Sequence, residues 1–99
     1  MIDCDRITGF EWDAGNARKS VAKHDVSQAE AEPIFFNEPL FIVSDVKHSD
    51  AERRIHGLGQ TDNGRLLHVT FTLRQDETKI RVISARDMSR RERSYYDQT

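Results

Sequence analysis

Three strand-like runs in the second half of the chain constrain its fold most strongly. They are residues 53–61, 65–74 and 78–86, rich in β-branched and apolar side chains. Consecutive strands that are joined by tight turns pair antiparallel. Residues 9–12 alternate as a further strand, and residues 40–43 are apolar enough to predict a buried one. The sequence therefore predicts an antiparallel sheet.

Helix signals occupy the first half and the C-terminal end. Residues 14–24 are predicted to form a helix after Asp13, a favourable N-cap, with Ala17 and Val21 facing the core. A second helix, residues 28–37, begins at a capping box and contains Pro33, which should kink or split it. Because each capping box places a Ser three residues before a Glu, the two boxes are Ser27 with Glu30 and Ser89 with Glu92.

The second capping box opens a C-terminal helix over residues 90–98. The predicted order is therefore β-α-α-β-β-β-β-α, an α+β fold with its helices packed on one face of the sheet. The 99 residues are enough for a single domain, 1–99, and residues 1–8 are expected to be a loose lead-in.

Composition excludes several classes of protein. A single cysteine rules out a disulfide framework and a cysteine-based zinc site, and the four histidines have no metal-ligand spacing, so we expect no metal and no cofactor. No apolar run is long enough to span a membrane and no signal peptide is recognisable, which predicts a cytoplasmic protein. The net charge is −2, but residues 52–99 carry ten Lys and Arg against seven Asp and Glu.

Loop length fixes which side chains share a face of the sheet. A three-residue loop with Gly64 in a left-handed conformation pairs Ile55 with Phe71 on the apolar face. The next hairpin then pairs Thr72 with Arg81 on the opposite face. In this register, the opposite face carries two guanidinium groups and two imidazoles, those of Arg54, Arg81, His56 and His68.

Two neighbouring guanidinium groups suit a phosphodiester, which accepts planar, bidentate hydrogen bonds. The ordinary alternative is that each arginine pairs with a nearby carboxylate on a solvated face. A second candidate is the segment from Lys47 to Arg54, where His48 and Glu52 could move protons during RNA cleavage. Taken alone, a histidine in a loop is more often simply solvated.

The C-terminal helix holds a third candidate, because it is rich in arginine and tyrosine. Arg90 could contact a nucleic-acid backbone, and Tyr95 could stack on a base. Equally, Glu92 could pair locally while one of the two tyrosines packs under the sheet.

A set of short motifs is distributed over most of the chain. They are Phe10-Glu11-Trp12-Asp13, Lys23-His24-x-Val26-Ser27, Glu38-Pro39-Leu40, Asp45-x-x-His48-Ser49, Glu52-x-Arg54, Gly59, Arg81-Val82-Ile83-Ser84-Ala85-Arg86 and Arg90-Arg91-Glu92-Arg93-x-Tyr95. In these motifs the chain resembles the BrnT family, the toxins of bacterial type II toxin–antitoxin modules. The resemblance covers residues 9–96, and its most specific part runs from Arg81 to Tyr95. Ala14 and Asp25 stand where family members often have Pro and Gly, and the pI near 6.1 is lower than is common among such toxins.

The resemblance implies a RelE-like fold and a metal-independent endoribonuclease that inhibits translation and growth. It also implies a hetero-oligomer with a BrnA-type antitoxin, whose ribbon-helix-helix part binds operator DNA, so that the toxin reaches DNA only through the antitoxin. The family's polar residues fall here on His48, Glu52, Arg54, Arg81 and Arg86.

We therefore expect catalysis at one set of residues and RNA binding at another. The catalytic set is His48, Glu52, Arg54 and Arg81, and the RNA-binding set is Lys47, His56, His68, Arg86, Arg90 and Tyr95. The alternative is a weak or inactive toxin homologue that acts as a binding module and co-repressor with its antitoxin.

Overall fold

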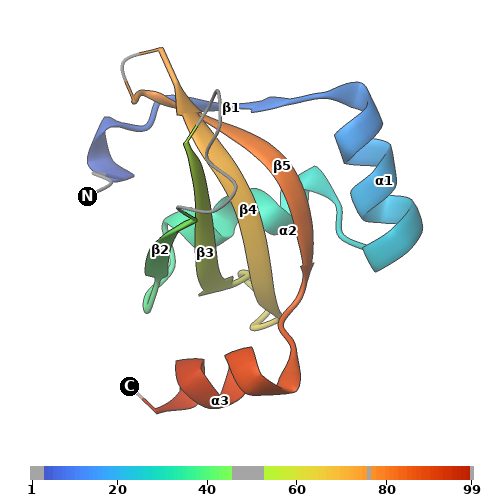
Figure 1. The fold of residues 1–99 in the computed structure, drawn as a ribbon, viewed down its shortest axis with the longest axis vertical. Coiled ribbons are helices and arrows are strands. Elements are labelled where there is room, and N and C mark those ends of the chain that lie inside the picture. Colours follow the sequence, from blue (N-terminus) through green and yellow to red (C-terminus); the bar gives the residue numbers. More distant parts are fainter. Residues whose placement is uncertain (1–3, 46–52, 76, 99) are drawn as a thin grey trace.

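A five-stranded sheet forms the centre of the structure, a computed structural model that describes residues 4–45, 53–75 and 77–98 (Figure 1). Its strands lie in the order β1-β5-β4-β3-β2. They are β1 (Gly9–Trp12), β2 (Phe41–Asp45), β3 (Arg54–Gln60), β4 (Leu66–Arg74) and β5 (Lys79–Asp87). The predicted α+β class and order of elements are confirmed.

The prediction of a purely antiparallel sheet was wrong for β1. Strands β2 to β5 are antiparallel neighbours, but β1 lies parallel to β5 and aligns Phe10 with Ile80 and Trp12 with Val82. Two α-helices separate β1 from β2 in the sequence, so β1 is not joined to another strand by a tight turn that would predict its neighbour in the sheet. Its alternating aromatic side chains select the edge of β5, where they extend the apolar face.

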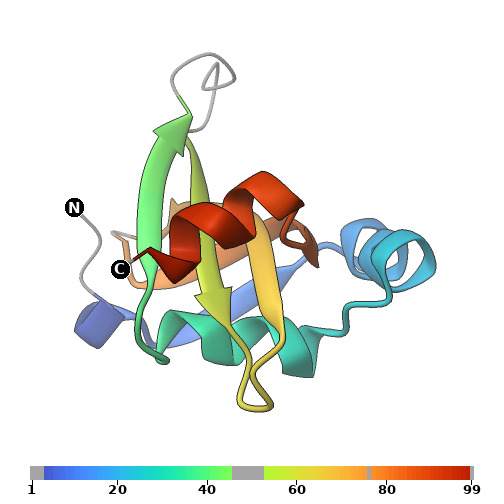
Figure 2. The ribbon, with the colours of Figure 1, turned by 90° about the horizontal axis from the view of Figure 1, so that it is seen from below.

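The helical segments occupy both faces of the sheet. They are η1 (Cys4–Arg6), α1 (Ala14–His24), α2 (Gln28–Ala31), η2 (Glu32–Phe35) and α3 (Arg90–Asp97). Helix α1 packs beside β5, and α2 with η2 crosses the apolar face, whereas α3 lies on the opposite side of the sheet (Figure 2). The expectation that all helices cover one face was therefore wrong for α3. Its Tyr96 joins Met88 in a second apolar cluster with Leu58.

Local sequence explains where the helices begin and end. The Asp13 carboxylate accepts the Gly15 N–H, and both predicted capping boxes are present, at Ser27 and at Ser89. Pro33 divides the predicted second helix into α2 and the 3-10 helix η2, because proline removes a helical hydrogen bond. Asp25 ends α1 with a left-handed φ of 54°.

The main core lies between the apolar face of the sheet and the α2–η2 segment. Phe35 packs edge-on against Phe71 at 4.9 Å between ring centroids, and Ile34 is fully buried. Ser20 of α1 faces the sheet, where its hydroxyl accepts the Ala85 N–H. Val21 was expected to face the core but is 52% exposed, one position around the helix from Ser20.

The run predicted as a buried strand is also more open than expected. Strand β2 is an edge of the sheet, and Val43 on it is 54% exposed. An uninterrupted apolar run is typical of a buried strand, but it does not show whether a second neighbour exists.

Candidate functional site

The register predicted for the two hairpins is confirmed. Ile55 lies opposite Phe71, and Thr72 opposite Arg81. Gly64 has the left-handed φ of 83° that the three-residue loop requires. The side of the sheet away from α2 and η2 is therefore polar. We call this side the polar face, and its residues are Arg54, His56, His68, Thr70, Thr72, Arg81, Ser84 and Arg86.

Two stacked imidazoles occupy the middle of the polar face. The rings of His56 and His68 lie 4.9 Å apart between centroids, with an interplanar angle of 37°. His56 Nδ1 and Thr70 Oγ1 form a hydrogen bond of 3.0 Å. Thr70 and Thr72 are buried, so the longer side chains around them shield these two threonines from solvent.

His68 is held in its neutral form. Burial, more than any other cause, lowers its pKa to about 4, and the positive charge of Arg86 lowers it further. The Glu92 carboxylate, 3.8 Å from His68 Nε2, opposes this shift but does not overcome it. At neutral pH His68 therefore offers a hydrogen-bonding nitrogen and no positive charge.

One end of the polar face is closed by α3. Arg86 donates to both oxygens of Glu92, at 2.8 and 3.0 Å, while Glu92 also accepts the Ser89 N–H. Burial alone would raise the pKa of Glu92, but these hydrogen bonds outweigh it and lower the pKa to about 2. The pair fixes the first turn of α3 to β5, so Arg86, expected at an RNA-binding position, has a carboxylate partner of its own.

The other end of the polar face holds the row of Arg54, Thr72 and Arg81 on three adjacent strands. Arg81 Nη2 lies 3.7 Å from Asp13 Oδ2, with both side chains partly exposed. This contact is longer than a charge-assisted hydrogen bond and contributes little to stability. Arg54 lies opposite Asp45 in the β2–β3 register.

The two tyrosines of α3 differ in environment. Tyr96 is buried and donates a 2.6 Å hydrogen bond to the Pro39 carbonyl. Tyr95 is 55% exposed and meets Phe41 edge-on. Arg90 is exposed on the first turn of the helix. One tyrosine thus packs as core while the other stays at the surface.

Three of the predicted site residues lie outside the described residues, so their predicted roles stay predictions. These are Lys47, His48 and Glu52. Of the ten predicted site residues, the structure places Arg54, His56, His68, Arg81 and Arg86 on the polar face and Arg90 and Tyr95 on α3.

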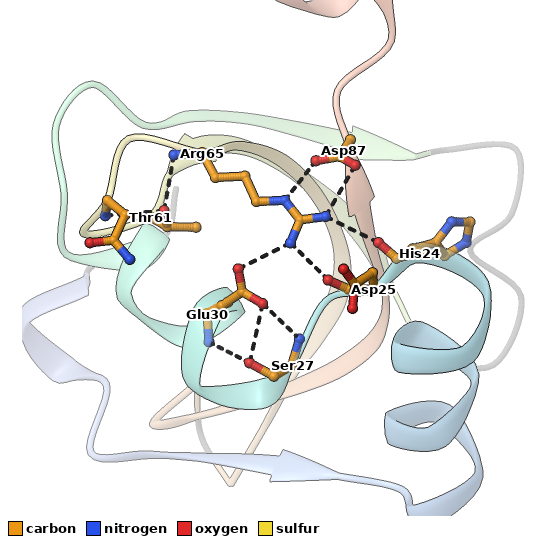
Figure 3. Close-up of polar contacts among 8 residues, drawn as sticks. His24, Asp25, Ser27, Glu30, Thr61, Arg65 and Asp87 are labelled. Carbon is orange, nitrogen blue, oxygen red and sulfur yellow. Dashed lines mark hydrogen bonds and ion pairs between the residues drawn. The ribbon is translucent and has the colours of Figure 1, made fainter.

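Sequence reasoning missed the most densely bonded polar side chain of the described structure, that of Arg65 (Figure 3). Its guanidinium donates to both oxygens of Asp87, at 2.8 and 3.1 Å, and to Glu30 at 3.0 Å. It also donates to the main-chain carbonyls of His24 and Asp25. We call these five residues the Arg65 hub; it joins the ends of α1, α2 and β5.

The hub is a structural centre rather than a reactive one. All five N–H groups of the guanidinium are used, which leaves none for a ligand. The hydrogen bond from Arg65 lowers the pKa of both Glu30 and Asp87 and so keeps both carboxylates ionised. The only signal in the sequence was Arg65 directly after the Gly64 turn, which does not indicate a distant partner.

The described residues form neither a metal-binding cluster nor a transmembrane helix. Across residues 4–45, 53–75 and 77–98, no group of three His, Cys, Asp or Glu side chains is arranged to hold a metal ion. No helix in the described part of the chain is long and apolar enough to cross a membrane.

Comparison with known proteins places this fold in a family. The model of the family described as the ribonuclease toxin BrnT of type II toxin–antitoxin systems matches residues 12–92. The fold is similar to the crystal structure of the Brucella abortus ribonuclease toxin BrnT, with a TM-score of 0.61 and 20% sequence identity over 83% of this chain and 97% of that chain. No curated protein matches the sequence. Because the family model spans most of the chain, this protein belongs to the BrnT family of ribonuclease toxins, whose partners are antitoxins.

Proposed function

We propose that this toxin cleaves RNA without a metal ion, at the end of the polar face that carries Arg54, Thr72 and Arg81. The observation that supports the proposal most strongly is the register that aligns these residues on three neighbouring strands. Helix α3 covers the opposite end of the face, around Leu58 and Met88. An RNA strand would therefore cross β3, β4 and β5 beside the stacked histidines.

The reaction in this proposal is an internal transfer of the phosphate. The 2′-oxygen of one nucleotide forms a bond to the neighbouring phosphorus while the bond from phosphorus to the 5′-oxygen breaks. The products are a 2′,3′-cyclic phosphate and a free 5′-hydroxyl. A base removes the proton from the 2′-hydroxyl and an acid protonates the departing 5′-oxygen, and His48 and Glu52 are the proposed pair.

The guanidinium groups of Arg54 and Arg81 stabilise the extra negative charge that develops on the phosphorane. Arg81 suits this role because its contact with Asp13, at 3.7 Å, is long and can be exchanged for a phosphate. His56 and His68 border the path of the RNA, while Arg90 and Tyr95 extend it onto α3; Lys47 is a further proposed RNA-binding residue. Arg86 would join them only by sharing its hydrogen bonds to Glu92 with a phosphate.

The biological role in the proposal is inhibition of translation and growth, with neutralisation by a BrnA-type antitoxin. A ribbon-helix-helix part of that antitoxin would bring the complex to operator DNA, and the site of action would be the cytoplasm. The charge of the chain fits a toxin that meets DNA only through its partner, since its net charge is −2.

The test is RNA cleavage by the purified chain in the presence of EDTA. Arg81→Ala should lower the rate by roughly a hundredfold or more, the loss typical of removing one donor to a transition-state oxyanion. Arg18→Ala, which removes a positive charge on α1, is the matched control and should leave the rate unchanged. Growth arrest on induction should be lost with Arg81→Ala and kept with Arg18→Ala.

Two results would contradict the proposal. Cleavage that stops with EDTA would refute metal independence. A folded wild-type chain that binds its antitoxin but leaves RNA intact would favour the alternative, an inactive homologue that acts as a co-repressor.

A further inference from the structure

Strand β2 exposes a backbone edge together with apolar side chains. Within the described residues its only strand neighbour is β3, so one edge of Phe41–Asp45 has no strand against it. Ile42 is 36% exposed and Val43 54% exposed. Exposed apolar edge strands attract further strands, and proteins usually shorten, charge or cover them.

The exposed side chains extend from β2 onto α3. The ring of Phe41 meets that of Tyr95 at 5.6 Å between centroids, and Tyr95 is 55% exposed. Side chains alternate along a strand, so Val43 lies on the same side as Phe41 while Ile42 lies on the other. We call Phe41, Ile42, Val43 and Tyr95 the β2 edge patch.

We propose that an extended segment of the antitoxin, apolar at its centre and acidic at its flanks, adds to β2 as a sixth strand and covers the β2 edge patch. The main-chain groups of β2 would supply the hydrogen bonds, and the alternating apolar side chains would set the register. The proposal rests on the antitoxin partnership of the proposed function and not on its RNA chemistry.

The charges of α3, on one side of the patch, favour an acidic partner over a second copy of this chain. Three exposed arginines of α3 outnumber its one exposed carboxylate, since Glu92 is engaged by Arg86; they are Arg90, Arg91 and Arg93. Helix α3 lies beside β2 through the contact of Tyr95 with Phe41. Pairing two β2 edges about a two-fold axis would therefore bring two arginine-rich helices together, whereas an acidic segment would be attracted.

The position of the patch connects it to the polar face. Val43 is the direct cross-strand neighbour of His56. Adjacent strands lie about 4.8 Å apart, so a strand added to β2 would lie roughly 10 Å from β3. Residues flanking the added strand can therefore reach the polar face and compete with RNA there.

The test measures binding of the full-length antitoxin encoded with this chain to four forms of the purified toxin by calorimetry. Val43→Glu should weaken binding at least tenfold, and Val43→Lys should weaken it less, because lysine restores attraction to an acidic segment. Val21→Glu is the matched control, since Val21 is 52% exposed but lies on α1; it should change affinity less than twofold. Amide hydrogen exchange of wild-type β2 should slow at least tenfold in the complex, a measurement that needs no variant.

Several outcomes would overturn the proposal. The first is an amide exchange rate in β2 that does not change when the antitoxin binds. The second is a loss of antitoxin affinity in Val21→Glu as large as in Val43→Glu. The third is a dimer of the toxin alone that Val43→Glu abolishes, which would make a second copy the occupant of the patch. Antitoxin binding is measured without RNA, so it does not depend on the RNA chemistry. If the wild type does not cleave RNA but Val43→Glu still loses the antitoxin, the RNA chemistry fails and the docking proposal stands.

Discussion

Two arginines, Arg65 and Arg81, show how differently the same side chain is held in this structure. Arg65 donates five hydrogen bonds to partners on α1, α2 and β5, all between 2.7 and 3.1 Å. Arg81 makes one ion pair of 3.7 Å within the described residues. A guanidinium whose donors are all used stabilises the fold, whereas one held by a single long contact can exchange it for a ligand.

The largest expected effect is at the Arg65 hub. Arg65→Met should lower the free energy of unfolding by roughly 3 kcal/mol, because it removes five hydrogen bonds, although the carboxylates of Glu30 and Asp87 are 40% and 62% exposed and regain water. Arg81→Met should cost less than about 1 kcal/mol, as for other exposed ion pairs. Urea unfolding of both variants measures the difference. Equal losses would show that the two arginines do not divide between structure and function.

A second prediction concerns the response of the polar face to acid. His68 has a folded-state pKa of about 4 against an ordinary value of 6.5, so the unfolded chain binds more protons between these values. The free energy of unfolding should therefore fall as the pH drops from about 6.5 to about 4, by roughly 3 kcal/mol at most. His68→Leu should remove this part of the pH dependence. The same slope in wild type and variant would mean that another group causes it.

The smallest predicted effect is at the turn that carries Arg65. Gly64 has a φ of 83°, and a Cβ there would meet no atom within 4 Å, so Gly64→Ala costs only backbone strain. Thermal unfolding should report a loss of about 1 kcal/mol, and Gly64→Asn should lose less, because asparagine tolerates left-handed conformations better. A loss as large as that of Arg65→Met would mean that the turn itself positions the hub.

The sequence was sufficient to predict interactions between residues close together in the chain. The capping boxes, the split at Pro33 and the pairing of Thr72 with Arg81 each depend on a few neighbouring residues or one loop length. The parallel partner of β1, the face of α3 and the contacts of Arg65 depend on residues 20 to 70 positions away, for which no local rule exists. The exposure of Val43 was mispredicted for the same reason. Strand β2 has only β3 as a neighbour within the described residues, and the residues of β2 alone do not show how many neighbours it has.

The acidic first half and the basic second half of the chain contact each other in the folded structure. Asp13 meets Arg81 and Glu30 meets Arg65, so part of the opposite charge of the two halves is paired across the fold. The low pI therefore does not by itself indicate a weak RNA-binding surface. The relevant quantity is the charge of the polar face, where Arg54 and Arg81 lie.

The parallel alignment of the first strand with the last has a consequence for how this toxin is made. Strand β1 is synthesised early, but its neighbour β5 is the last strand to be synthesised, so β1 cannot pair with β5 until then. The sheet then closes late, and with it the row that contains Arg81. A partly translated chain that ends before β5 lacks both the partner of β1 and Arg81 itself, so the proposed site can form only after β5 has been synthesised.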